Sequence, residues 1–113
     1  MADAHANFAI SAVVTPPSPA TTGTTLTVTT GQGARFPTPP FNASVWASGA
    51  TPDPTNAEIV RVTAVSTDTF TIIRGQEQST ARSIVLGDQI ALTVTAKTLT
   101  DVEVPHPFLF VGV

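Results

Sequence analysis

Residues 56–73 read NAEIVRVTAVSTDTFTII, and this stretch indicates the fold class. Apolar side chains recur at every second position in both of its halves, as in a strand, where successive side chains point to opposite faces. The polar triplet STD at 66–68 separates the two halves. The pattern therefore predicts a β-hairpin with strands at 56–65 and 69–73.

Two further segments show strand alternation. In residues 21–30, TTGTTLTVTT, Leu26 and Val28 share one face and threonines share the other. Residues 90–96, IALTVTA, alternate in the same way and follow the turn signal Gly87-Asp88. The chain is therefore expected to be all-β, as a small β-sandwich or a partly open barrel of about five to six short strands.

The stretch 33–56 is predicted to be rich in loops, because it holds five prolines together with two phenylalanines and the single Trp. One interpretation is a packed connection that aromatic side chains pin onto the sheet. The alternative is an exposed aromatic patch, in which Phe36, Phe41 and Trp46 stack on sugars as in a carbohydrate-binding module.

The domain organisation is expected to be one β domain at 21–103 between two arms. The N-terminal arm, 1–20, contains PPSP, which disfavours helix and favours extended chain. The C-terminal arm, 104–113, folds back on its own domain or docks on a neighbouring subunit, for instance as an added strand. Its apolar side chains are candidate subunit-interface residues: Phe108, Leu109, Phe110, Val111 and Val113.

Composition excludes several classes of function. The 113 residues suit one domain, and 12% of them are charged, against about 25% in ordinary domains. Twenty threonines fill much of the difference, and the absence of Cys removes disulfides and cysteine nucleophiles. A net charge of −3 argues against nucleic-acid binding, which relies on basic side chains. No apolar run is long enough for a membrane helix, and the first residues lack the pattern of a signal peptide.

No catalytic, cofactor or metal site is expected. The two histidines, His5 and His106, lie in the terminal segments, and no serine has the G-x-S-x-G surroundings of a nucleophile elbow. The carboxylates are scattered without a calcium-loop pattern, and Asp101, Glu103 and His106 make at most a weak metal site. The sequence thus predicts a protein that is not an enzyme.

Charged residues gather in RGQEQSTAR, residues 74–82. One interpretation is a local salt-bridge network that holds the loop in shape. The alternative is that Arg74 or Arg82 pairs with a carboxylate of a neighbouring subunit. On that alternative Arg74, Glu77 and Arg82 join the candidate subunit interface.

Residues 58–90, EIVRVTAVSTDTFTIIRGQEQSTARSIVLGDQI, closely resemble a module of bacteriophage tail-fibre and minor tail proteins. In that module an E-x-V-x-V strand leads through a D-T-hydrophobic-T hairpin to R-G-Q-E-G-T-x-A-R and a G-D turn. Residues 18–46, with G-Q-G-A-R-F-P, look like its opening half, so the resemblance covers residues 7 to about 103. Gln78 stands where the family has Gly, and relatives continue into a fibre shaft where this chain ends.

The resemblance implies a β-rich structural module that carries no catalytic residues and usually forms oligomers. The positions that match the motif are expected to be structural: Glu58, Arg61, Arg74, Gln76, Glu77, Thr80 and Arg82. The expected function is that of a virion structural protein, assembled in the bacterial cytoplasm as a homotrimer on the tail, baseplate or fibre. A capsid decoration protein is the alternative. The expected partners are other virion proteins and further copies of the chain, without nucleic acid or membrane.

Overall fold

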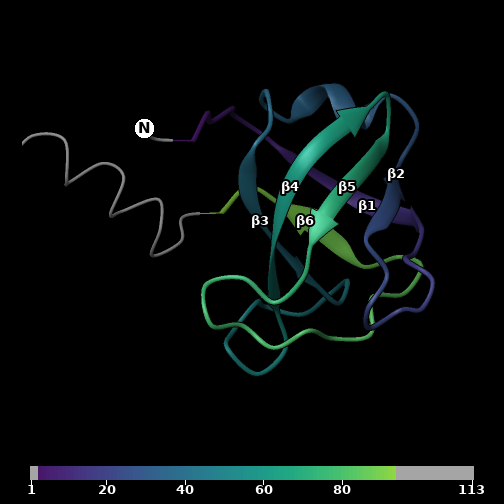
Figure 1. Ribbon diagram of the computed structural model, residues 1–113, viewed down its shortest axis with the longest axis vertical. Coiled ribbons are helices and arrows are strands. Elements are labelled where there is room, and N and C mark those ends of the chain that lie inside the picture. The colour runs from purple at the N-terminus through teal and green to yellow at the C-terminus, as the bar shows by residue number, and fades with distance from the viewer. Residues whose placement is uncertain (1–2, 94–113) are drawn as a thin grey trace, which may run out of the picture.

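The computed structural model describes residues 3–93, and this part of the chain forms an all-β domain (Figure 1). The all-β class expected from the sequence is confirmed. A short 3-10 turn, η1 (Gln32–Arg35), lies between the second and third strands. The six strands of the described residues are β1 (Ile10–Thr15), β2 (Thr25–Val28), β3 (Phe41–Trp46), β4 (Glu58–Ser66), β5 (Thr69–Ile73) and β6 (Gln89–Ala91).

The strands form a closed antiparallel barrel in the order β1-β2-β5-β4-β3-β6. Closure comes from β1 and β6, where Ser11 pairs with Ile90, and from β3 and β6, where Val45 pairs with Ile90. The central strand β4 lies between β3 and β5. Of the two expected architectures the barrel is therefore the one that forms, and it is closed, so each strand has a neighbour on both sides.

The hairpin predicted at 56–73 is confirmed as β4 and β5 with a turn at 67–68. Asp68 of this turn accepts hydrogen bonds from the backbone N–H groups of Gly31 and Gly33, at 3.0–3.1 Å. A Cβ atom on Gly33 would lie 2.0 Å from the carbonyl oxygen of Thr67. The close approach of these two turns explains why Gly occupies position 33.

The barrel interior is filled by apolar side chains from all six strands. Its largest members include Phe41 and Phe70, both fully buried. The ring centroid of Phe36 lies 4.9 Å from that of Phe70, with the rings edge to face, and 5.8 Å from that of Phe41. Such aromatic pairs add about 0.5–1.5 kcal/mol each beyond the burial of their area.

Two strands lie where the sequence predicted an arm and a loop. β1 falls within 1–20, and its alternate side chains Ser11 and Val13 are buried in the barrel. β3 falls within 33–56 and is buried on both faces. The prolines before and after β3 suggested a loop. They lie outside the strand, so its six residues are free to pair with the neighbouring strands. The end of the strand expected at 90–96 and the whole C-terminal arm lie outside the described residues.

Because neighbouring strands are antiparallel, three of the four long connections, 16–24, 47–57 and 74–88, lie at one end of the barrel, here called the loop end. The other end, here called the hairpin end, holds the 67–68 turn, the β2–β3 connection at 29–40, the start of β1 and the end of β6 (Figure 1). There the N–H of Leu92 donates to the carbonyl of Ala9, so the two chain ends of the barrel lie side by side. Within residues 3–93 no helix is long and apolar enough to span a membrane.

Candidate functional site

A buried ion pair organises the loop end. Glu58, the first residue of β4, is fully buried, and its carboxylate accepts hydrogen bonds from Arg74 Nε at 2.8 Å and Arg74 Nη2 at 2.9 Å. The backbone N–H groups of Gly75 and Arg82 also donate to it, at 2.8 and 2.9 Å. A buried carboxylate needs partners of this kind, because water no longer solvates its charge.

The guanidinium of Arg74 extends the same network to other segments of the loop end. It donates to the backbone carbonyls of Ala20 and Gly23 in the β1–β2 connection, at 3.0 and 2.9 Å. It also donates to the carbonyl of Arg82, at 2.6 Å. One arginine therefore connects the start of β4, the end of β5, the β1–β2 connection and the β5–β6 loop.

The surroundings of Glu58 act on its pKa in opposite directions. Burial raises the pKa, whereas the hydrogen bonds from Arg74, Arg82 and Gly75 and the charge of Arg74 lower it. The net effect is a pKa below the ordinary value of 4.5. Glu58 is therefore ionised at neutral pH, as the counter-charge of Arg74.

A second ion pair holds the end of the β5–β6 loop. The guanidinium of Arg82 bonds the carboxylate of Asp88, which is 2% exposed. The same carboxylate accepts a hydrogen bond from the N–H of Val85, at 2.9 Å. Gly87, with φ +91°, allows the chain to turn here, so the Gly-Asp turn signal is confirmed.

A third polar chain runs over the outside of β3 and β4. Arg61 pairs with Asp3 at 3.1 Å and donates to Asn42 Oδ1 at 3.0 Å. Asn42 in turn donates from Nδ2 to Glu77, at 2.6 Å. No buried side-chain nitrogen or oxygen of the described residues lacks a hydrogen-bond partner.

The side chains of the three charged residues at 74–82 thus bond to residues outside that segment. The network does shape the loop, but its partners are Glu58, Asp88 and Asn42. Sequence reasoning missed these partners, although a lone Glu at the start of an apolar strand was a usable signal. The proposed roles of Arg74, Glu77 and Arg82 in a subunit interface remain predictions. The apolar interface candidates at 108–113 lie outside the described residues.

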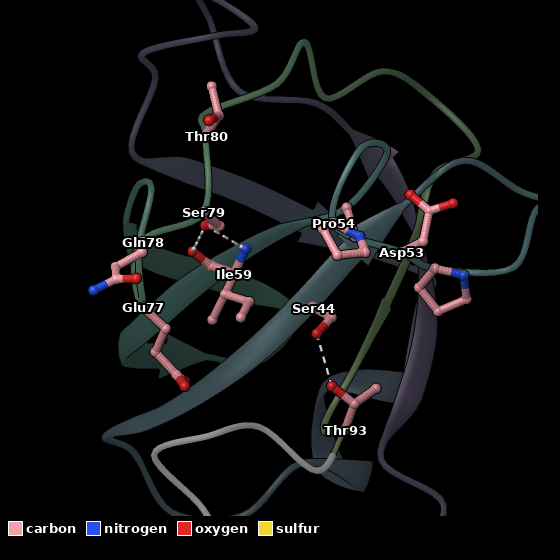
Figure 2. A pocket seen from close by; sticks show the side chains of 11 residues that line it. Ser44, Asp53, Pro54, Ile59, Glu77, Gln78, Ser79, Thr80 and Thr93 are labelled. Atoms are coloured by element: carbon pink, nitrogen blue, oxygen red, sulfur yellow. Dashed lines mark hydrogen bonds between the residues drawn. The ribbon is translucent and has the colours of Figure 1, made fainter.

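A pocket of about 430 Å³ lies on the outer side of β3 and β4 (Figure 2). Its walls come from the β3–β4 connection and from the first part of the β5–β6 loop. The hydroxyls of Ser44 and Thr93 are hydrogen-bonded at 2.7 Å, and Ser79 bonds the backbone of Ile59. The lining residues are Ser44, Pro52, Asp53, Pro54, Ala57, Ile59, Glu77, Gln78, Ser79, Thr80 and Thr93.

The loop wall of this pocket contains two residues in the left-handed backbone region. Glu77 has φ +51° and Gln78 has φ +67°. Non-glycine residues rarely adopt this region, which costs them roughly 1–2 kcal/mol. Position 78 is where the resembled family has Gly, and the chain adopts the conformation of a tight turn there with Gln.

The carbohydrate platform considered from the sequence is wrong for these aromatics. Phe41 is fully buried, Phe36 is 8% exposed and Trp46 is 6% exposed. Phe36 and Phe41 pack in the barrel interior. Rings that are covered by the protein cannot stack on a sugar, so the platform is absent.

Within residues 3–93 no three His, Asp or Glu side chains gather closely enough to hold a metal ion. No protein-family model matches the chain, and a search of curated proteins finds no significant relative. The function therefore has to be inferred from the residues and their geometry.

Proposed function

We propose that this chain is a structural module of a bacteriophage virion, attached to the tail, baseplate or fibre as a homo-oligomer, most simply a trimer. The barrel is a rigid unit, and the segments outside it hold neighbouring subunits. The motif at 58–90 supports the bacteriophage origin. The barrel geometry supports the assembly role.

The observation that carries the proposal is the bond from Leu92 N–H to the carbonyl of Ala9 at the hairpin end. The segments before residue 9 and after residue 92 therefore start from adjacent points at the hairpin end. Both can contact the same neighbouring subunit. Phe8, at the first of these points, is 88% exposed and has φ +58°. A large exposed aromatic in a strained conformation suits a contact with another chain.

The sequence at 104–113 supplies the apolar surface for this contact. Its five large apolar residues would each contribute about 1.5–3 kcal/mol on burial. The entropy of ordering the segment offsets part of that gain. Because every strand of the closed barrel has two neighbours, we expect the segment to bury side chains against a neighbour rather than to extend an open sheet edge.

The ion pairs support a structural rather than a catalytic role. Arg61, Arg74 and Arg82 each bond a carboxylate of the same chain. Glu58 and Asp88 are buried with their hydrogen-bonding capacity used by the fold. Such groups stabilise loops and are poorly placed to exchange protons with a substrate.

A capsid decoration protein is the second candidate, since a compact barrel with two adjacent chain ends also suits a trimer on a capsid lattice. Cryo-electron microscopy of the assembled particle distinguishes the two locations. We expect density for the barrel on the tail, baseplate or fibre, in few copies per particle. Barrel density repeated over the capsid would favour decoration, and absence of the barrel from the particle would overturn both.

A further inference from the structure

We propose that the outer face of β1 receives residues 104–113 of a neighbouring copy of this chain. The inference rests on the assembly role proposed above and names the surface that this role requires. Its observations are the exposed apolar side chains along β1, the lack of charged residues in β1 and β6, and the point at which residues 94–113 leave the barrel.

Exposed apolar side chains gather along β1. Ser11 and Val13 are buried in the barrel, so the alternate side chains of the strand point outward. In the described part of the chain, five of the six exposed large hydrophobic residues lie in β1 or in segments bonded to it, namely Phe8, Ile10, Val14, Val85 and Leu86. An exposed apolar patch of this kind marks a contact surface.

Leu86 extends this row of side chains to the loop end. The N–H of Gly87 donates to the carbonyl of Val13 at 2.9 Å, and the N–H of Val13 donates to the carbonyl of Asp88 at 2.7 Å. The pairing of β6 with β1 therefore continues through these residues, and it places Leu86, which is 70% exposed, beside the end of β1. The exposed row is here called the β1 stripe and consists of Phe8, Ile10, Val14 and Leu86.

The β1 stripe and the proposed occupant match in chemistry. Neither β1 nor its neighbour β6 contains Asp, Glu, Lys or Arg. The sequence at 104–113 contains none of these four either, and it includes five large apolar residues. A contact between the two would therefore bury mainly apolar surface, which is favourable, and little charge, which would be costly.

The direction of β6 favours a neighbour's stripe over the chain's own. β6 runs antiparallel to β1, and its end at Leu92 is bonded to Ala9 at the hairpin end. To lie along its own β1, the chain after residue 93 would have to reverse its direction. It can reach the β1 stripe of another copy without that reversal.

The sequence after residue 93 is long enough for this contact. Residues 94–103 can span up to about 33 Å when extended, and residues 104–113 can span as much again. The β1 stripe from Phe8 to Val14 is about 20 Å long, because a strand rises about 3.3 Å per residue. The first ten residues can therefore bridge two barrels, and the last ten can cover the stripe.

The first test is sedimentation equilibrium of the full chain and of three variants. We expect Leu86→Asp and Val14→Asp each to raise the dissociation constant of the oligomer roughly tenfold or more, because each places a charge in an apolar contact. Ile73→Asp is the matched control, since Ile73 is also an exposed hydrophobic residue but lies on β5, two strands from β1. It should change the dissociation constant by less than about twofold.

Three results of this test would overturn the inference. Stripe variants that assemble like the parent would show that another surface is used, and equal weakening by Ile73→Asp would show a general effect of added charge. In both cases the parent oligomer would still support the proposed function. A monomeric parent would overturn the inference and the proposed function together. Circular dichroism reports that each variant is folded.

Disulfide trapping identifies the occupant, because the chain has no Cys of its own. Full chains carrying Leu86→Cys are mixed with full chains carrying Gly112→Cys and oxidised with copper phenanthroline. We expect a linked dimer in which mass spectrometry finds position 86 of one chain joined to position 112 of the other. Ile73→Cys in place of Leu86→Cys should link far less. A double variant, Leu86→Cys with Gly112→Cys, that closes its disulfide within single chains while the mixed chains stay unlinked would overturn the inference.

Discussion

Glu58 and Arg74 form a two-pronged ion pair in the interior of the loop end, with Nε–Oε2 and Nη2–Oε1 distances of 2.8 and 2.9 Å. The two residues stand at the start of β4 and directly after β5, which are hydrogen-bonded neighbours in the barrel. Their side chains also bind the β1–β2 connection and the β5–β6 loop. The pair therefore determines how the connections at this end pack together.

Removing the cation of this pair should destabilise the protein strongly. Arg74→Gln leaves the fully buried Glu58 without its counter-charge, so we expect a loss of about 3–5 kcal/mol in the free energy of unfolding. Arg35→Gln is the matched control, because Arg35 is exposed and its guanidinium donates to the backbone carbonyl of Ile10 at 3.2 Å. It should cost about 1 kcal/mol or less. Urea unfolding followed by Trp46 fluorescence measures both, and equal losses would contradict the role given to Arg74.

Acid should weaken the fold through Glu58. The pKa of this carboxyl lies below the ordinary value of 4.5 in the folded protein, so the unfolded chain binds its proton more readily. The stabilisation is therefore complete above pH 4.5 and is lost as the pH falls from there through the folded-state pKa.

Glu58→Gln tests this pH dependence, because glutamine does not titrate. Urea unfolding at a series of pH values should give a shallower fall in stability below pH 4.5 for the variant than for the parent protein. Parallel curves for the two proteins would show that other groups cause the acid sensitivity.

Relieving the left-handed strain in the pocket wall should stabilise the protein. Gln78→Gly removes the Cβ at φ +67°, and we expect a gain of up to about 1 kcal/mol after the added entropy of the unfolded chain. Thr80→Gly is the control, because Thr80 lies in the same loop without a positive φ. It should destabilise, by about 0.5–1 kcal/mol. A loss of stability in Gln78→Gly would mean that its side chain contributes more than its backbone costs.

Gly31 and Gly33 at the hairpin end test two different reasons for a glycine, which are the left-handed backbone and the lack of space for a Cβ atom. Gly33→Ala would place a Cβ atom 2.0 Å from the Thr67 carbonyl oxygen, so the hairpin must shift, with an expected loss above about 3 kcal/mol. In Gly31→Ala the new Cβ atom has no other atom within 4 Å. The expected loss of stability, roughly 1–2 kcal/mol, therefore comes from the left-handed backbone at φ +83° alone. Melting temperatures of the two variants rank the costs. A smaller loss for Gly33→Ala than for Gly31→Ala would contradict the close packing of the two turns.

The elements that could be predicted are those whose signals lie within a few neighbouring residues of the sequence. The hairpin at 56–73 and the turn at Gly87-Asp88 could be predicted because alternation and turn residues act over a few positions. β3 shows the same alternation, because Asn42 and Ser44 separate Phe41, Ala43 and Val45, but the prolines on either side of it indicated a loop. Both polar residues are buried, and they hydrogen-bond to Glu77, Arg61 and Thr93.

The candidate site was harder to predict than the fold. Arg74 and Glu58 are 16 positions apart, and barrel pairing brings them together. The sequence alone showed the concentration of charge at 74–82 but not which carboxylates would meet it. The pocket likewise arises where two connections, distant in sequence, cross the same face of β3 and β4.

The central claim is that this barrel assembles through the segments outside it. Its most direct test is the mass of the purified protein in solution, measured by sedimentation equilibrium for the full chain and for a chain cut after Asp101. We predict a homo-oligomer, most simply three times the 11.7 kDa of one chain, for the full protein, and a folded monomer for the shortened one. A full-length protein that remains monomeric, or a shortened protein that assembles equally well, would contradict the account.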